Sequence, residues 1–253
     1  MKRLSIFIYG ALCYAATLVT FAYTFLFLGN LGLPRTLDSE GSATLPGALL
    51  IDVALVVLFG LQHSLMARPG FKRRWTRIVP EAAERSTYML FSCVALLALF
   101  IAWQPLGGTV WEASTPLARR LIYGLYSLGW VILLLASFLI NHFDLFGLRQ
   151  VWLQLRGQSY RPLPFGTPLL YRVVRHPIYV GWLLIFWAAP TMTAAHLVFA
   201  LATSAYILVA IRLEERDLIE AHPEYANYRE RVPMLVPSLR RPTADTTRVA
   251  TGV

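Results

Sequence analysis

Long apolar segments alternate with short polar connections along almost the whole chain. Four of them, at about 4–28, 47–66, 86–103 and 121–140, carry very few charges. Each is close to or above the roughly 20 apolar residues that a helix needs to cross a hydrocarbon core of about 30 Å. The pattern therefore predicts four membrane-spanning helices.

A fifth apolar stretch, residues 178–211, is too long for one crossing. As a continuous helix its 34 residues would extend about 50 Å, against a hydrocarbon core of about 30 Å. Pro190 lies near its middle and removes a helical hydrogen bond, and the small polar residues Thr191 and Thr193 after it suit a turn. The sequence predicts a helical hairpin, made either of two full crossings or of two shortened re-entrant helices.

The composition agrees with a membrane protein. Hydrophobic residues make up 57% of the 253 residues and charged residues 15%, whereas soluble domains carry about a quarter charged residues. Cys13 and Cys93 both lie inside apolar segments and imply no disulfide framework. We expect an all-α polytopic bundle: four spanning helices, a C-terminal helical hairpin, and a short cytoplasmic amphipathic helix within 212–237.

The positive charges predict how the chain is oriented. The net charge is +9, and Lys and Arg are concentrated at 2–3, 68–84 and 145–175, while the loops at 30–46 and 104–118 are poor in them. Basic loops face the cytoplasm, so we expect a multi-pass membrane protein with both termini cytoplasmic. The clustering in loops between apolar segments also argues against nucleic acid as the partner of these charges.

This topology brings polar residues from several segments to one depth, at the cytoplasmic edge. They are Gln62, His63, Ser64, Asn141, His142, Asp144, Arg175, His176, Glu214 and Glu215. Polar and ionisable groups at membrane segments are costly, which indicates a functional site, although a single histidine at a helix end is more often a capping residue. The histidines lack the spacing of zinc ligands, so we predict no metal.

A motif opens the C-terminal half of the chain. Arg175-His176-Pro177-x-Tyr179-x-Gly181 is followed by the apolar hairpin, by Glu214-Glu215 and by Tyr225-x-x-Tyr228. This order resembles the catalytic half of integral-membrane methyltransferases, such as isoprenylcysteine carboxyl methyltransferases and phospholipid N-methyltransferases. The first motif alone is also similar to membrane sterol reductases.

Four further motifs extend the resemblance along the chain. They are QHSLMARP at 62–69, ERSTY at 84–88, INHFDLFGLRQ at 140–150 and LEERDL at 213–218. Together they resemble the bacterial methanethiol S-methyltransferases, within the broader NnrU-like membrane family. The resemblance implies a single methyltransferase domain over 1–237, with a helical scaffold at 1–141 and a cofactor-binding catalytic half at 142–237. The Thr- and Arg-rich tail 238–253 is expected to be disordered.

The resemblance also implies a reaction and a cofactor. S-adenosylmethionine and the small thiol methanethiol would give dimethyl sulfide and S-adenosylhomocysteine. The residues implied to bind the cofactor are Arg175, His176, Tyr179, Gly181, Glu214 and Glu215. A carboxylate can pair with the methionine ammonium, a basic side chain with its carboxylate, and a glycine permits close approach to a helix. The chain has no GxGxxG fingerprint, so we expect the cofactor at the membrane edge.

A thiol must lose its proton before it accepts a methyl group. The reference pKa of a cysteine thiol is about 8.5, and a neutral histidine is the natural base. His63 and His142 lie outside the cofactor motif and are the candidates for this base. Asp144 is a candidate to orient His142, although two residues apart on a helix is poor geometry for it.

Three other classes of function stay open. A related membrane methyltransferase would use another acceptor, such as an isoprenylcysteine or a phospholipid headgroup; the motifs at 62–63 and 141–142 favour the thiol. A membrane reductase would use a nicotinamide cofactor. A non-enzymatic NnrU-like protein or a small transporter is the third class, but a transporter would place its charges at the midplane rather than at one edge. The sequence indicates no oligomeric state.

Overall fold

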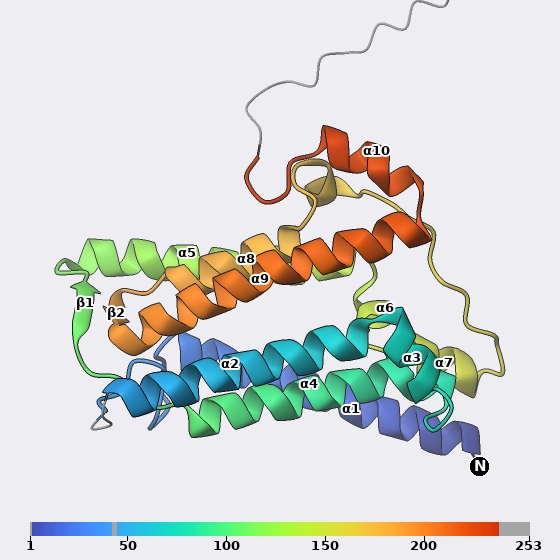
Figure 1. The fold of residues 1–253 in the computed structure, drawn as a ribbon, viewed down its shortest axis with the longest axis horizontal. Helices are drawn as coiled ribbons and strands as arrows, with labels where there is room; N and C mark the ends of the chain where they lie inside the picture. The colour runs from blue at the N-terminus through green and yellow to red at the C-terminus, as the bar shows by residue number, and fades with distance from the viewer. Residues whose placement is uncertain (1, 42–44, 238–253) are drawn as a thin grey trace, which may run out of the picture.

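Five long apolar helices form the body of the molecule (Figure 1). In this computed structural model, which describes residues 2–41 and 45–237, they are α1 (Lys2–Leu28), α2 (Leu45–Ala67), α4 (Glu81–Ala102), α5 (Pro116–Leu139) and α9 (Ala194–Ala221). All five are long and apolar enough to cross a membrane. The chain is therefore a polytopic helical membrane protein, which confirms the predicted fold class. The predicted tail 238–253 lies outside the described residues.

Two of the spanning helices begin earlier than hydropathy predicts. α4 begins at Glu81 and α5 at Pro116, rather than at 86 and 121. At the start of α5, the Thr115 side chain accepts a hydrogen bond from the Ala118 N–H at 3.2 Å, and Pro116 occupies the first turn. Caps and first turns contain polar residues that remain in water, so apolar patterns miss them.

The basic connections contain short helices that the sequence analysis did not predict. α3 (Pro69–Trp75) follows α2, and α6 (His142–Leu145) and α7 (Leu148–Leu155) follow α5, before a single 3₁₀ turn, η1 (Leu169–Arg172). Gly147 adopts φ +88° at the start of α7, and a Cβ there would lie 2.7 Å from the main-chain nitrogen of Ser86. Tertiary packing against α4 therefore fixes this turn.

The predicted hairpin is present, with arms of unequal length. α8 (Pro177–Trp187) has 11 residues, about 17 Å at 1.5 Å per residue, and α9 has 28. The turn contains a short strand, β2 (Thr191–Thr193), paired antiparallel with β1 (Thr109–Glu112). α9 continues to Ala221, so residues 212–221 belong to a spanning helix, and the separate amphipathic helix is α10 (Glu224–Arg231).

The helices pack in two layers (Figure 1). In this view α5, α8 and α9 lie above α1, α2 and α4, with α3, α6, α7 and the N-terminus at one end and the two strands at the other. Aromatic side chains fill the space between the helices: the rings of Phe27 and Phe100 are 4.5 Å apart, and Trp103 meets Phe199 at 5.5 Å. The C-terminal ends of α2 and α5, which lead into α3 and α6, lie at the same end of the molecule (Figure 1), as predicted.

Two glycines bring α5 and α8 into close contact. A Cβ on Gly181 would lie 2.8 Å from the carbonyl oxygen of Gly129, and a Cβ on Gly129 would lie 2.9 Å from the carbonyl oxygen of Gly181. Small residues allow helix backbones in membranes to approach this closely. The short arm of the hairpin is therefore fixed on α5.

A buried polar network fixes the turn of the hairpin at the opposite end. His196 Nδ1 lies 2.9 Å from Asp38 Oδ2, and its Nε2 lies 3.0 Å from the carbonyl oxygen of Phe186. Thr193 donates to the other oxygen of Asp38 at 2.8 Å. His196 thus lies away from the edge that carries the motifs.

Candidate functional site

Arg175, His176 and Glu215 form a compact buried cluster. Glu215 Oε1 accepts hydrogen bonds from Arg175 Nε at 2.7 Å, from His176 Nε2 at 3.0 Å and from the Tyr225 hydroxyl at 3.3 Å. Only 8% of Glu215 is exposed. Buried charges are tolerated when they are paired and hydrogen-bonded. The structure therefore brings the two ends of the hairpin together, as the topology predicted.

Arg175 also holds the segment that follows α10. Its Nη1 donates to the carbonyl oxygens of Arg229 and Val232, at 3.0 and 2.5 Å. Its main-chain N–H and that of the next residue donate to the carbonyl oxygens of Pro233 and Met234, at 2.9 and 3.2 Å. These bonds close residues 229–234 over the start of α8.

Glu214 has a different set of neighbours from Glu215. The Tyr179 hydroxyl donates to Glu214 Oε2 at 3.0 Å, and electrostatic interactions connect Glu214 with Tyr88 and Tyr206. Adjacent residues on a helix point about 100° apart, so the two carboxylates face different groups. Both predicted glutamates consequently contact residues of the motif at 175–181.

Gly181 packs against α5, as described above. That contact alone requires a residue without a side chain at position 181. The contact with a cofactor expected of Gly181 stays a prediction.

His63 is bound on both ring nitrogens by residues of α4. Its Nδ1 lies 3.0 Å from Ser92 Oγ. The Tyr88 hydroxyl lies 2.7 Å from Nε2 and 3.1 Å from Nδ1, so its shorter contact is with Nε2. The Ser92 hydroxyl donates to the carbonyl oxygen of Tyr88, so Ser92 Oγ is left to accept a proton from Nδ1. This assigns the proton of a neutral imidazole to Nδ1 and makes Nε2 the acceptor.

Polar contacts connect the His63 region of α2 with α9, the helix of the two glutamates. Ser64 Oγ and the Tyr206 hydroxyl are 3.1 Å apart, and Arg68 pairs with Asp217 at 2.9 Å. These contacts lie on either side of the Glu214 position. The structure thus brings His63 to the same region as the cofactor motif.

His142 lies in an aromatic enclosure. Its Nδ1 is 2.9 Å from Ser137 Oγ and its Nε2 is 2.9 Å from the Tyr14 hydroxyl. The ring stacks on Phe138 at 4.3 Å and packs on Phe146 at 4.6 Å. Only 3% of the residue is exposed, and this burial lowers the pKa of His142.

Asp144 points away from His142. Its carboxylate accepts from Arg149 Nη1 at 2.7 Å and from the Tyr160 hydroxyl at 3.3 Å. The two ring nitrogens of His142 are engaged by other residues, so the structure does not support Asp144 as the group that orients it. The separation of two residues in α6 explains why the two side chains diverge.

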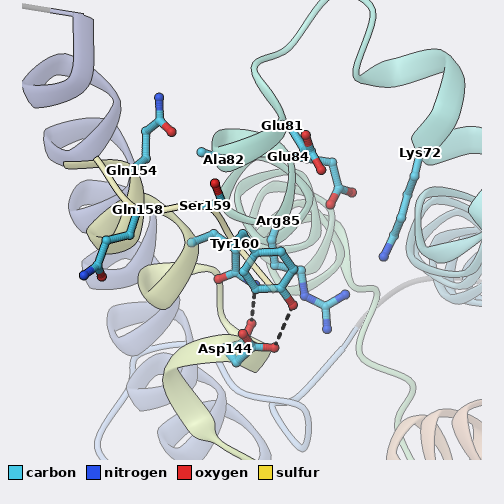
Figure 2. Close-up of a pocket in the computed structure, with 11 residues that line it drawn as sticks. Lys72, Glu81, Ala82, Glu84, Arg85, Asp144, Gln154, Gln158, Ser159 and Tyr160 are labelled. Atoms are coloured by element: carbon cyan, nitrogen blue, oxygen red, sulfur yellow. Dashed lines mark hydrogen bonds between the residues drawn. The ribbon is translucent and has the colours of Figure 1, made fainter. Parts of the chain in front are cut away.

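Asp144 instead lines a polar cavity of about 560 Å³. Figure 2 shows this cavity, with Tyr160 beside Asp144. Its lining residues come from α3, the start of α4 and the α6–α7 region: Lys72, Glu81, Ala82, Glu84, Arg85, Asp144, Gln150, Gln154, Gln158, Ser159 and Tyr160. A volume of roughly 300–1,000 Å³ is typical of small-molecule sites. Within residues 2–41 and 45–237 no His, Cys, Asp and Glu side chains form a group of three that could hold a metal ion.

Known proteins similar to this chain cover nearly all of it. A methanethiol S-methyltransferase of Crocosphaera subtropica is 53% identical over 238 residues, which are 94% of this chain and 93% of that protein. A methanethiol S-methyltransferase of Mycobacterium tuberculosis is 47% identical over 244 residues, 96% of this chain and 100% of that protein. The chain belongs to the methanethiol S-methyltransferase family.

Members of the methanethiol S-methyltransferase family are not its only relatives. Nurim of Xenopus laevis is 31% identical over 179 residues, which cover 66% of this chain and 61% of that protein. No family model and no solved structure matches the chain. The membership therefore rests on the similarity to the methanethiol S-methyltransferases.

Several residues around the candidate site of this methanethiol S-methyltransferase family member were not predicted from the sequence. Tyr88 ends the motif at 84–88 and Ser92 follows one turn later on α4, so a signal was present for the first of them. Tyr206 is one tyrosine in the apolar run of α9. Lys72 and Arg85 lie in or beside a loop whose charges had been explained by membrane orientation. Only the packing of α2, α4 and α9 shows what these side chains face.

Proposed function

We propose that this protein methylates methanethiol to dimethyl sulfide, with S-adenosylmethionine as the methyl donor. The site would lie at the cytoplasmic edge of the bacterial inner membrane, with both chain termini on that side. The observation that carries the proposal is the near full-length similarity, at 47 to 53% identity, to proteins named methanethiol S-methyltransferase.

The residues proposed to hold the cofactor are Arg175, His176, Tyr179, Gly181, Glu214 and Glu215. S-adenosylmethionine supplies a methyl group activated by a positively charged sulfonium. Glu215 uses only Oε1 and Glu214 only Oε2 in hydrogen bonds with described residues. Each carboxylate therefore retains an oxygen for a cationic ligand, which fits this donor.

We propose that His63 is the base that accepts the proton of the thiol, and that the Tyr88 hydroxyl relays this proton. The thiol proton moves to the Tyr88 oxygen while the Tyr88 proton moves to His63 Nε2, which leaves a thiolate and an imidazolium. The hydrogen bond of 2.7 Å between the hydroxyl and Nε2 supports this transfer. Apolar surroundings favour a reaction in which a thiolate and a sulfonium lose their charges.

The geometry favours His63 over His142 as the base. Both nitrogens of each histidine have partners, but the tyrosine beside His142 is Tyr14 of α1. The tyrosine beside His63 is Tyr88, which interacts electrostatically with Glu214 of the proposed cofactor site. Asp144 belongs to the polar cavity rather than to His142. We therefore propose a packing role for His142.

An assay on membranes from cells that express the chain tests the function. Membranes receive S-adenosylmethionine and methanethiol, and headspace gas chromatography measures dimethyl sulfide. We expect product from the wild-type chain and its loss in His176→Ala and Glu215→Gln. Glu220→Gln is the matched control, because Glu220 is exposed on the same helix. If the folded wild-type protein binds S-adenosylhomocysteine but makes no dimethyl sulfide, the methyl acceptor is a molecule other than methanethiol.

A further inference from the structure

The polar cavity holds charged side chains that form no ion pair at contact distance among the described residues, although Glu84 and Asp217 act on Lys72 from further away. Lys72, Glu81 and Glu84 make no side-chain hydrogen bond or ion pair with any described residue, and Arg85 uses only Nε, which donates to the Leu145 carbonyl at 2.8 Å. Figure 2 shows Lys72, Glu84 and Arg85 directed into the same space without bonds between them. Cations and carboxylates that face one cavity unpaired are available to a ligand that carries both charges.

Two further observations indicate an incomplete site. Gln150 is 8% exposed, and its Oε1 is buried without a hydrogen-bond partner among the described residues. Buried polar atoms of this kind are rare in folded proteins. Burial also lowers the pKa of the Lys72 ammonium, so a carboxylate beside it would stabilise its charged form.

The cavity adjoins the reacting groups proposed above. Arg85 lines the cavity, and its guanidinium carbon lies 5.3 Å from the centre of the Tyr88 ring, the residue that binds His63. Lys72 interacts electrostatically with Asp217 of α9, one turn beyond Glu214. A ligand in the cavity can therefore extend toward Glu214 and Tyr88.

The chemistry of the lining selects one class of ligand. Three carboxylates, those of Glu81, Glu84 and Asp144, would repel a phosphate or another simple anion. Lys72 and Arg85 would repel a metal ion. A group with an ammonium and a carboxylate on one carbon can pair with the acidic and with the basic side chains of the cavity at the same time.

We propose that this cavity binds the α-amino-acid end of S-adenosylmethionine. Lys72 and Arg85 would hold its carboxylate, and Glu84 and Glu81 its ammonium. The sulfonium is only two methylene groups from that end and would lie toward Glu214. Arg175, whose donors are already used by Glu215 and by main-chain carbonyls, would contribute to holding the rest of the cofactor by fixing Glu215. This inference rests on the proposed function.

Two ligands that differ only in the amino-acid end provide the test. S-adenosylhomocysteine has this end, and 5′-methylthioadenosine lacks it. Isothermal titration calorimetry on the purified full-length protein in detergent measures both in the wild type, in Lys72→Met and in Glu84→Gln. Arg73→Met is the control, because Arg73 is the exposed neighbour of Lys72 and lies outside the cavity.

We expect the Kd of S-adenosylhomocysteine to rise about 10- to 100-fold in Lys72→Met and in Glu84→Gln, as for the loss of one charge-assisted hydrogen bond. The Kd of 5′-methylthioadenosine should stay within about twofold, which also shows that the variants are folded. Equal weakening of both ligands, or of neither, would overturn the inference. If neither ligand bound the wild-type protein, the result would instead contradict the proposal that S-adenosylmethionine is the cofactor.

Discussion

Two histidines in this protein have the same hydrogen-bond pattern in different settings. Each has Nδ1 beside a serine and Nε2 beside a tyrosine hydroxyl, and each serine donates its own proton to a helix carbonyl. The pattern assigns the same tautomer to both rings. What differs is the surrounding. The His142 ring packs on Phe138 and Phe146, whereas the His63 ring packs on Phe59 and on Tyr88, which interacts electrostatically with Glu214.

This pairing gives a test of which histidine is the base. We predict that Tyr88→Phe lowers kcat about 10- to 100-fold at neutral pH, because it removes the hydroxyl that carries the proton to His63. Tyr14→Phe removes the equivalent hydroxyl from His142 and should leave kcat within about twofold. Initial rates of dimethyl sulfide formation measure both. A large loss in Tyr14→Phe with a normal Tyr88→Phe would transfer the role to His142.

The burial of His142 predicts a pH dependence of stability. Its pKa in the folded protein lies below the ordinary value of about 6.5, so the unfolded chain binds the proton more tightly. The stabilisation is present above pH 6.5 and is lost as the pH falls below it. The unfolding temperature in detergent should therefore drop between pH 7.5 and 5.5. His142→Phe should flatten this drop; an unchanged slope would assign it to another group.

At the scale of the helix, the close crossing of α5 and α8 leaves no room for a side chain at Gly129. Gly129→Ala would place a Cβ 2.9 Å from a main-chain oxygen of α8, and overpacking of this kind costs about 1–3 kcal/mol. Gly124→Ala is the matched control on the same helix, because nothing lies within 4 Å of its added Cβ. Thermal unfolding in detergent should show a loss for Gly129→Ala alone. Equal behaviour of the two variants would contradict the crossing.

Hydropathy predicted the elements that a membrane dictates and missed those that tertiary contacts dictate. Four crossings and the hairpin follow from lengths of apolar chain. The turn at Gly147 and the pairing of β1 with β2 depend on residues far away in the sequence, as does the unequal length of the hairpin arms. In the site, motifs predicted His63 and Glu214, but the contact of His63 with Tyr88 depends on how α2 and α4 are rotated.

For the whole molecule, the alternation of the helices predicts which ends share a side. α3 and β1 lie at opposite ends of the bundle (Figure 1), so Arg74→Cys should face the cytoplasm and Glu112→Cys the periplasm. The native Cys13 and Cys93 are buried and should not react. A membrane-impermeant maleimide should label Glu112→Cys in spheroplasts and Arg74→Cys only in inverted vesicles. Labelling of Arg74→Cys in spheroplasts, and of Glu112→Cys only in inverted vesicles, would show that the chain has the opposite orientation.

The bonds that Arg175 and the main-chain N–H of His176 make to residues 229–234 have an evolutionary consequence. Their partners there are main-chain oxygens, and every amino acid provides one. Side chains along this segment can therefore change with little effect on the closure over α8, except Met234, which packs against the hydrophobic core. The number of residues between α10 and Met234 cannot change so easily, because one insertion would carry every acceptor past its donor. Apart from Met234, the residues of this part of the protein can vary while their number is held constant.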